Sequence, residues 1–273
     1  MSDPSTVLIT GATDGLGRAL ALRLAESGTR LLLHGRNPER GDQVRREVVA
    51  LGAPEPVLLL ADLAARAEVD RLAAAVQAVT DRLDVLVNNA GVGFGAPGAG
   101  RELSPDGVEL RFAVNYLAVV RLTRRLLPLL RRSAPARIVN VASAGQFPLD
   151  FGDLMLDRDY DGVTAYRRAK LAEIMFTFDL AEELGGTGVT VNALHPASFM
   201  DTSMVRESGV GPHSSVEEGL AATLPLVEAE SLAGVSGRYF NGRSPARALD
   251  QAYDPDARRR LREATAALLP DLG

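Results

Sequence analysis

The amino-acid sequence predicts an α/β protein built on a doubly wound parallel sheet. Three observations lead to this prediction. Short apolar segments alternate with longer segments rich in Ala, Leu, Arg and Glu. The short segments are almost entirely apolar, without the alternation of polar and apolar residues that a half-exposed strand shows. A glycine-rich turn follows the first of them. Strands that are buried on both faces need helices on both sides of the sheet. Ligands of such folds bind at the carboxyl ends of the strands.

The first half of the chain reads as alternating strands and helices. We expect strands at residues 6–10, 30–34, 56–60 and 84–88, and helices at 16–27 and 64–80. Another helix starts at Asn37-Pro38, where Asn37 serves as N-cap and Pro38 fits the first helical position. Residues 92–103 are rich in glycine and form a loop.

The second half continues the same alternation. Ser104-Pro105 predicts the start of a long helix that ends near residue 132. A strand at 136–142, an irregular acidic segment at 143–163, a helix at 164–184 and a strand at 189–194 follow. We expect a loop containing Pro196 and residues 209–212, a helix near 215–230, a short strand at 237–240 and a charged C-terminal helix. The chain shows no linker or repeat, which predicts one domain over residues 1–273.

Composition excludes several classes of protein. The chain contains no cysteine, and its three histidines (His34, His195 and His213) lie far apart, so we expect no metal site. A net charge of −5 does not suggest nucleic acid or an anionic membrane as partner. The N-terminal residues do not form a signal peptide and no segment is apolar enough to span a membrane, so we expect a cytoplasmic protein.

The first strand runs into a glycine-rich loop, Thr10 to Gly17, with the spacing G-x-x-x-G-x-G. Residues without a Cβ let the backbone approach a pyrophosphate at the N-terminus of the following helix. The motif therefore predicts a dinucleotide site. The alternative is a tight strand-to-helix turn that binds no ligand.

The end of the second strand indicates which dinucleotide binds. An NAD-binding protein usually offers a carboxylate to the ribose hydroxyls there. This chain has His34-Gly35-Arg36-Asn37 and no acid before Glu39. Arg36 could pair with a 2′-phosphate, which favours NADP(H) over NAD(H). The alternative is that Arg36 is a solvated surface residue.

The glycine loop and five further motifs together resemble the short-chain dehydrogenase/reductase family, in its single-domain branch. After the glycine loop come Asp62-Leu63, the run from Asn88 to Gly91, Asn115, Ser143, and Tyr166 with Lys170 in the spacing Y-x-x-x-K. They span residues 6 to about 200, and the stretch 137–204 most resembles the retinol-dehydrogenase-like branch. The resemblance implies a Rossmann fold of about seven strands. It implies a cofactor half at about 5–142 and a catalytic and substrate half at about 143–273.

Two features depart from the common family pattern. Ser143 and Tyr166 are farther apart than usual, which we interpret as an insertion at 146–163 that is typical of the retinol-dehydrogenase-like branch. The family's Pro-Gly after the sixth strand is Pro196-Ala197 here, and the following threonine is displaced to Thr202. The second departure affects the expected contacts with the nicotinamide.

The resemblance implies an oxidoreductase that interconverts a carbonyl and an alcohol. Tyr166 would be the acid in reduction and the base in oxidation, and Lys170, one helical turn away, would lower the tyrosine's pKa from about 10. Lys170 would also bind the ribose. Ser143 would polarise the substrate oxygen, or else cap a turn. Asn115 would take part in a proton relay, or else be a satisfied core residue.

The expected cofactor contacts extend over five segments. Asp62 would accept from the adenine amino group or cap the helix near residue 64. The full set of expected cofactor-binding residues is Thr10, Gly11, Thr13, Asp14, Gly15, Leu16, Gly17, Arg36, Asn37, Asp62, Leu63, Asn89, Ala90, Gly91, Tyr166, Lys170, Pro196 and Ser198.

The substrate is expected to be a small lipophilic or aromatic molecule. Apolar side chains cluster in the irregular segments: Phe94, Phe147, Phe151, Tyr160, Phe199, Met200 and Met204. They could instead pack the loops onto the domain. Asp150, Asp153, Asp157, Asp159 and Asp161 are expected to form a solvated rim. The family resemblance implies a homodimer or homotetramer. The alternatives to this enzyme are a catalytically silent NADP(H)-binding regulator and an enzyme of another reaction type, such as a dehydratase or isomerase.

Overall fold

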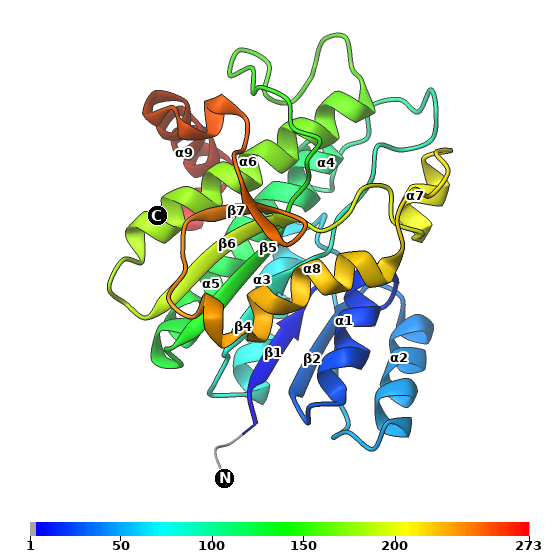
Figure 1. The fold of residues 1–273 in the computed structure, drawn as a ribbon. Helices are drawn as coiled ribbons and strands as arrows, with labels where there is room; N and C mark the ends of the chain where they lie inside the picture. Colours follow the sequence, from blue (N-terminus) through cyan, green and yellow to red (C-terminus); the bar gives the residue numbers. More distant parts are fainter. Residues whose placement is uncertain (1–3, 273) are drawn as a thin grey trace.

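The computed structural model describes residues 4–272 and contains one sheet of eight strands (Figure 1). The strand order is β3-β2-β1-β4-β5-β6-β7-β8, parallel throughout except for the antiparallel pair β7–β8. The strands are β1 Thr6–Ile9, β2 Arg30–Gly35, β3 Val57–Leu60, β4 Val85–Asn88, β5 Ala136–Val141, β6 Val189–His195, β7 Arg238–Asn241 and β8 Ser244–Ala246.

Helices connect the strands on both faces of the sheet. They are α1 Gly15–Ala25, α2 Pro38–Ala50, α3 Arg66–Val79, α4 Leu110–Phe112, the π-helical segment η1 Ala113–Leu117, α5 Ala118–Arg132, α6 Gly162–Glu183, α7 Ser203–Glu207, α8 Val216–Glu228 and α9 Pro255–Leu268. Short 3₁₀ turns lie at η2 Glu230–Leu232, η3 Asp250–Tyr253 and η4 Pro270–Leu272. The predicted doubly wound parallel fold is confirmed. The sheet has eight strands where about seven were expected, because β8 is a three-residue edge strand that contains Pro245.

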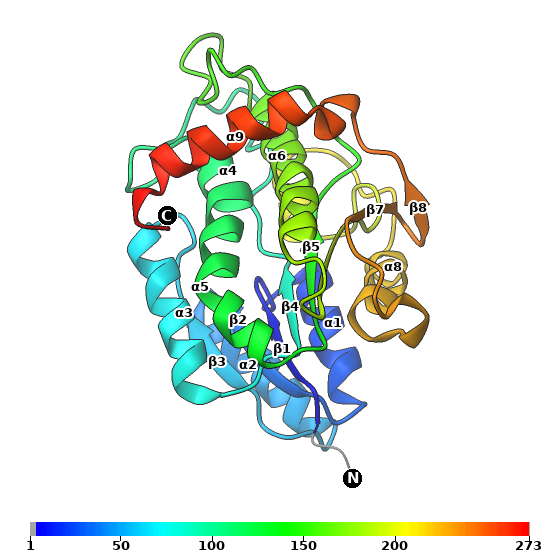
Figure 2. The same ribbon diagram turned by 90° about the vertical axis from the view of Figure 1, so that its left-hand side faces the viewer.

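Two apolar layers bury the faces of the sheet. One layer joins the sheet to α1, α2 and α8, and the other joins it to α3, α5, α6 and α9. Figure 2 looks onto the second layer, where α3, α5 and α6 lie side by side. The strand order reverses between β1 and β4, because β2 and β3 lie on one side of β1 while β4 to β7 lie on the other. This topological switch point opens a crevice at the carboxyl ends of the strands.

Local capping decides where the helices begin. Asn37 accepts a hydrogen bond from the Arg40 N–H, with Pro38 in the first position of α2, as predicted. The prediction for Ser104-Pro105 is wrong. The Ser104 hydroxyl accepts from the Asp106 and Val108 amides and forms a turn, and the helix starts at Leu110, capped by Glu109. Asp62, weighed as a cap for a helix near residue 64, accepts from the Ala64 N–H at 3.0 Å in a turn, and α3 itself begins four residues after Asp62.

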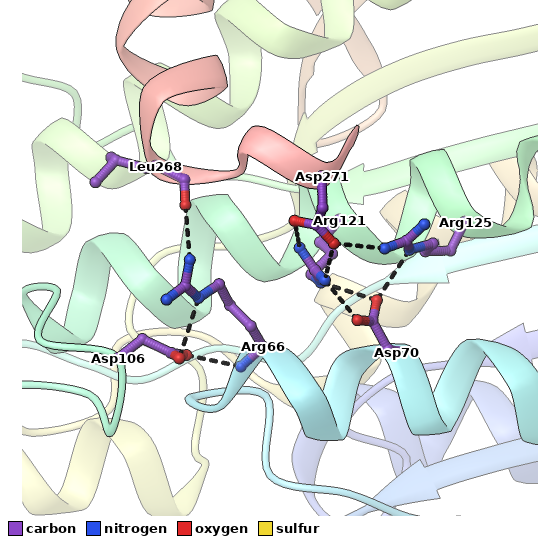
Figure 3. Close-up of polar contacts among 7 residues, drawn as sticks. All are labelled: Arg66, Asp70, Asp106, Arg121, Arg125, Leu268 and Asp271. Carbon is purple, nitrogen blue, oxygen red and sulfur yellow. Dashed lines mark hydrogen bonds and ion pairs between the residues drawn. The ribbon is translucent and has the colours of Figure 1, made fainter. Parts of the chain in front are cut away.

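The C-terminal segment crosses the layer made by α3, α5 and α6 (Figure 2). Arg258 of α9 pairs with Asp179 of α6, and the Thr265 hydroxyl lies 2.7 Å from that of Tyr116 in η1. Figure 3 shows the far end, where Asp271 and Asp70 of α3 flank the guanidinium of Arg121. The segment is therefore fastened to three elements that are distant in sequence.

No helix within residues 4–272 is both long and apolar enough to cross a membrane. The first three residues of the N-terminus, on which the prediction of no signal peptide partly depends, lie outside the described residues. The cytoplasmic location stays a prediction.

Candidate active site

A cavity of about 520 Å³ lies at the carboxyl ends of the strands. It extends from the glycine loop and the end of β2 to the N-terminal part of α6 and the segment after β6. This volume is in the range of small-molecule sites. Of the residues expected from sequence, the following line it: Gly11, Thr13, Asp14, Gly15, Leu16, Arg36, Asn37, Asp62, Leu63, Asn89, Ala90, Gly91, Ser143, Tyr166, Lys170, Pro196 and Ser198.

The glycine loop is shaped for close approach of backbone. Gly11 and Gly15 have φ values of 66° and 48°, which favour glycine. A Cβ on Gly17 would lie 2.2 Å from the Gly11 carbonyl oxygen, so Gly17 supports the loop from below and does not itself line the cavity. Asp14 caps α1, and the N-terminus of that helix faces the cavity. These features fit the pyrophosphate of a dinucleotide.

Thr10 and Asn89 tie the glycine loop to the end of β4. The Thr10 hydroxyl accepts from the Asn89 and Ala90 amides at 2.9 and 3.0 Å. The Asn89 side chain donates to the carbonyls of Thr10 and Gly11 at 2.9 and 3.1 Å. Thr10 thus positions the loop from outside the cavity, whereas the sequence predicted a direct cofactor contact.

His34 is a site residue to which the sequence analysis assigned no role. Its imidazole is 1% exposed, with Nδ1 accepting from the Gly11 N–H at 3.2 Å and Nε2 donating to the Ala61 carbonyl at 3.1 Å. Burial lowers the pKa of His34 from 6.5 to about 4, with the Ala61 bond opposing that effect. A neutral His34 therefore joins the carboxyl ends of three strands at the predicted adenosine end of the site.

Two arginines line the same end of the cavity, and a carboxylate accompanies each. Arg36 Nη1 lies 3.9 Å from Asp62 Oδ1, and Arg40 Nη1 lies 3.7 Å from Asp14 Oδ2. All four side chains are about half exposed, so the pairs are loose and can rearrange around a ligand. Arg40 was not predicted as a site residue. Its position in the first turn of α2, shortly after the end of β2, was the available signal.

Ser143 lies two residues after the end of β5 and is 8% exposed. Its hydroxyl oxygen accepts from the Gly145 N–H at 3.0 Å, and its carbonyl accepts from the Tyr239 hydroxyl at 3.1 Å. The turn cap and the catalytic role weighed from sequence are thus compatible. The hydroxyl is held by its oxygen, and its proton remains free to be donated into the cavity.

Tyr166 lies in the first half of α6, with its ring edge-on to Phe94 at 4.8 Å. The loop that carries Phe94 is fixed by Arg111, a buried residue of α4 whose guanidinium donates to the carbonyls of Gly93 and Phe94. Arg111 therefore helps to orient the tyrosine through the aromatic contact. The sequence analysis missed this role, because it depends on a contact between the loop and α4.

Lys170 lies one turn after Tyr166 on α6 and is 4% exposed. Its ammonium donates to the Val141 carbonyl at the end of β5, at 2.7 Å, and to Glu173 at 2.9 Å. Lys170 is the only lysine in the chain, since every other basic residue apart from histidine is arginine. This count was a signal in the sequence that lysine chemistry is needed at that position.

Asn115 is completely buried in the π-helical segment and does not line the cavity. Its side-chain oxygen accepts from the Val92 N–H at 2.8 Å, and its side-chain nitrogen donates to the Val92 carbonyl at 2.9 Å. The amide thus pins the loop after β4, as a satisfied core asparagine does. The role in a proton relay stays a prediction.

The apolar residues expected around the substrate divide into two groups. Phe94, Phe199, Met200 and Met204 line the cavity. The others do not: Phe147 and Phe151 contact the guanidinium groups of Arg168 and Arg260, and the Tyr160 hydroxyl donates to Glu109. They pack the insertion onto the domain.

Four of the five insertion aspartates are exposed. Asp153 differs from them, because its side chain is 9% exposed and accepts from the Asp157 and Arg158 amides.

In residues 4–272, no three His, Asp or Glu side chains form a group that could hold a metal ion.

Comparison with known proteins identifies the family. Residues 5–211 match the family described as short chain dehydrogenase, and the chain belongs to this family of oxidoreductases. It is 36% identical to human retinol dehydrogenase 14 over 94% of this chain and 83% of that protein. The predicted resemblance to the retinol-dehydrogenase-like branch is confirmed.

Two solved structures share the fold. A putative uncharacterized protein from Mycobacterium paratuberculosis has a TM-score of 0.78 and 26% identity, over 97% of this chain and 94% of that one. The NADP active-site complex of RhlG from Pseudomonas aeruginosa has a TM-score of 0.72 and 29% identity, over 87% of this chain and 94% of that one.

Proposed function

We propose that this protein is an NADP(H)-dependent oxidoreductase that interconverts a carbonyl and an alcohol on a small lipophilic substrate. The observation that carries the proposal is the cavity itself. It joins a glycine loop fit for a dinucleotide at one end to Ser143, Tyr166 and Lys170 at the other. A nicotinamide cofactor would supply the hydride in reduction and accept it in oxidation.

The three polar residues take complementary roles in proton transfer. The Ser143 hydroxyl, held by its oxygen, donates a hydrogen bond to the substrate oxygen as negative charge develops there. The Tyr166 phenol gives its proton to that oxygen in reduction and takes it back in oxidation. Lys170 lies on the same helix face, and its positive charge favours the phenolate. Its third ammonium proton can bind a ribose hydroxyl, because the other two are used by Val141 and Glu173.

The preference for NADP(H) rests on charge at the end of β2. Arg36 and Arg40 offer two guanidinium groups at this end of the cavity, and the carboxylates that accompany them are exposed enough to move away. A guanidinium fork matches a phosphate better than it matches hydroxyl groups. The related RhlG structure is described as an NADP complex, which agrees with this proposal.

The far end of the cavity is mostly apolar. Phe94, from the loop after β4, packs against the Tyr166 ring, and Phe199 and Met204 line the cavity from the segment after β6 and from α7. Such walls suit a lipophilic or aromatic carbonyl and provide few partners for a highly polar substrate.

The test is the initial rate of NADPH and NADH oxidation with aldehydes and ketones of increasing size and apolarity. We expect turnover that favours NADPH and increases with substrate apolarity. Arg36→Ala should weaken NADPH binding by about tenfold or more while changing NADH binding little, since only NADPH has the 2′-phosphate. Equal losses for both cofactors would refute the phosphate role. Tight NADPH binding without reduction of any carbonyl would favour the silent regulator.

A further inference from the structure

Glu173 is a buried acid beside the proposed proton-transfer residues, and the function proposed above gives it no role beyond accepting one hydrogen bond from Lys170. It lies on α6, three residues after Lys170, and its side chain is 1% exposed. One carboxylate oxygen accepts from the Lys170 ammonium at 2.9 Å. The other oxygen is buried and has no hydrogen-bond partner within the described part of the chain.

A carboxylate in such a place is costly unless it has a specific role. Burial of an ionised acid is unfavourable, and one ion pair leaves half of the hydrogen-bonding capacity of Glu173 unused. A glutamine would accept the same hydrogen bond from Lys170 without the charge. Glu173 therefore supplies both a hydrogen bond and a negative charge to the only lysine of the chain.

We propose that Glu173 is a positioning residue for proton transfer. Its carboxylate holds the Lys170 ammonium against the end of β5 and offsets part of its positive charge at Tyr166. The inference rests on the proposed function, since it assumes that Tyr166 exchanges the proton.

The electrostatics of the pair agree with this arrangement. Burial lowers the pKa of Lys170, but the negative charges of Glu173 and Tyr166 outweigh burial, and the net pKa lies above the ordinary value. Burial raises the pKa of Glu173 to about 7, against the effect of Lys170. Glu173 is therefore charged in the alkaline range, in which a tyrosine ordinarily loses its proton.

Apart from the pair itself and Tyr166, no titratable group within residues 4–272 is among the causes that shift the pKa of Lys170 or Glu173. Helix α6 packs against α4, η1, α5, β5, β6, β7, η3 and α9. None of the titratable side chains on these elements is among the groups that shift the pKa of Lys170 or Glu173; those on α4, η1 and the strands are Arg111, Tyr116, Arg137, His195, Arg238 and Tyr239. Asp179, Glu182 and Glu183, farther along α6, pair with arginines of α5 and α9 instead. The charge at Lys170 is therefore set within α6.

The single lysine allows a direct test that does not depend on activity. Protein labelled with ¹³C at lysine Cε gives one lysine side-chain resonance, which reports the titration of Lys170 in the protein as it exists. For wild type, we expect a high Lys170 pKa and a second inflection near pH 7 as Glu173 ionises. For Glu173→Gln, the second inflection should vanish and the Lys170 pKa should fall by about one unit or more.

Glu182→Gln is the matched control, because it removes one negative charge from the same helix at a side chain that is 70% exposed. Its lysine titration should match that of wild type. Should Glu173→Gln fail to fold, the Lys170 pKa of wild type still decides the matter, because a buried ammonium without a charged partner would titrate below its ordinary value. Identical lysine titrations in wild type and Glu173→Gln, or a wild-type Lys170 pKa below the ordinary value, would overturn the proposal.

The pH–rate profile for alcohol oxidation then tests the effect on Tyr166. Loss of the negative charge favours the phenolate, so the alkaline rise in rate should move to lower pH by about half a unit to one unit in Glu173→Gln. A smaller rate with an unmoved profile would mean that Glu173 is only structural. Absence of carbonyl turnover in wild type would refute the proposed function, while the lysine titration would still report on the pair.

Discussion

Protonation of His34 should destabilise the protein between pH 6.5 and pH 4. In the folded state, His34 Nδ1 accepts a hydrogen bond from the Gly11 N–H. A proton on Nδ1 would replace this hydrogen bond with a repulsive contact between two N–H groups. The ring is 1% exposed and its pKa is lowered to about 4, whereas the unfolded chain titrates near 6.5. Because the folded pKa is the lower one, the stabilisation is present above pH 6.5 and is lost as the pH falls through this window.

The magnitude follows from the two pKa values. The difference between a pKa of 6.5 in the unfolded chain and about 4 in the folded chain corresponds to about 3 kcal/mol of unfolding free energy, at 1.36 kcal/mol per pKa unit. About 2 kcal/mol of this stabilisation is lost by pH 5. A loss of this size is a large part of the stability of an ordinary domain.

The assay is the free energy of unfolding, from urea titrations at half-unit steps between pH 7.5 and pH 4. His34→Gln should be less stable than wild type at pH 7, and the difference should shrink toward pH 4, because the variant lacks the titrating group. His213→Gln, which changes an exposed histidine, is the control and should remain parallel to wild type. Wild-type and His34→Gln curves that stay parallel over the whole range would refute the reasoning.

Two further predictions concern the backbone cradle and the C-terminal segment. Gly17→Ala should lose about 1–3 kcal/mol of stability and most of its NADPH affinity, because the new Cβ would lie 2.2 Å from the Gly11 carbonyl oxygen. Chemical unfolding measures the stability and fluorescence titration measures the affinity. Gly100→Ala is the control and should be neutral, because its Cβ would meet no atom within 4 Å. Arg121→Ala should lose about 2 kcal/mol in urea unfolding, because its side chain is 5% exposed and pairs with two half-exposed acids. The exposed Arg259→Ala should change stability by no more than about 0.5 kcal/mol, and equal losses in the two arginine variants would contradict the account.

The parts of the fold that depend on local sequence could be predicted. Apolar strands, the Asn37-Pro38 cap and the glycine loop carry their signals within a few residues. The start of the helix before Asn115 could not be predicted. Ser104 matches the pattern of a cap, but its hydroxyl closes a turn, and Glu109 caps the helix from a buried position.

The parts of the site that depend on contacts between residues distant in sequence could not be predicted from the sequence. His34 is hydrogen-bonded to Gly11 and Ala61, which follow the neighbouring strands β1 and β3, and nothing near His34 in the sequence indicates these partners. Helix α7 has only five residues and is too short to show a helical period, although four of its residues line the cavity. The C-terminal charges have the pattern of a solvated helix. Their partners are known only from the folded chain: Arg121 of α5 for Asp271 (Figure 3), and Asp179 of α6 for Arg258.

The most direct test of the central claim is Tyr166→Phe, with NADPH binding and carbonyl reduction measured on the same protein. The change removes one hydroxyl and leaves the ring against Phe94. The account predicts NADPH affinity close to that of wild type and a rate at least about 100-fold lower, since general acid–base catalysis contributes at least that factor. Carbonyl reduction near the wild-type rate would contradict the assignment of Tyr166 as the proton donor.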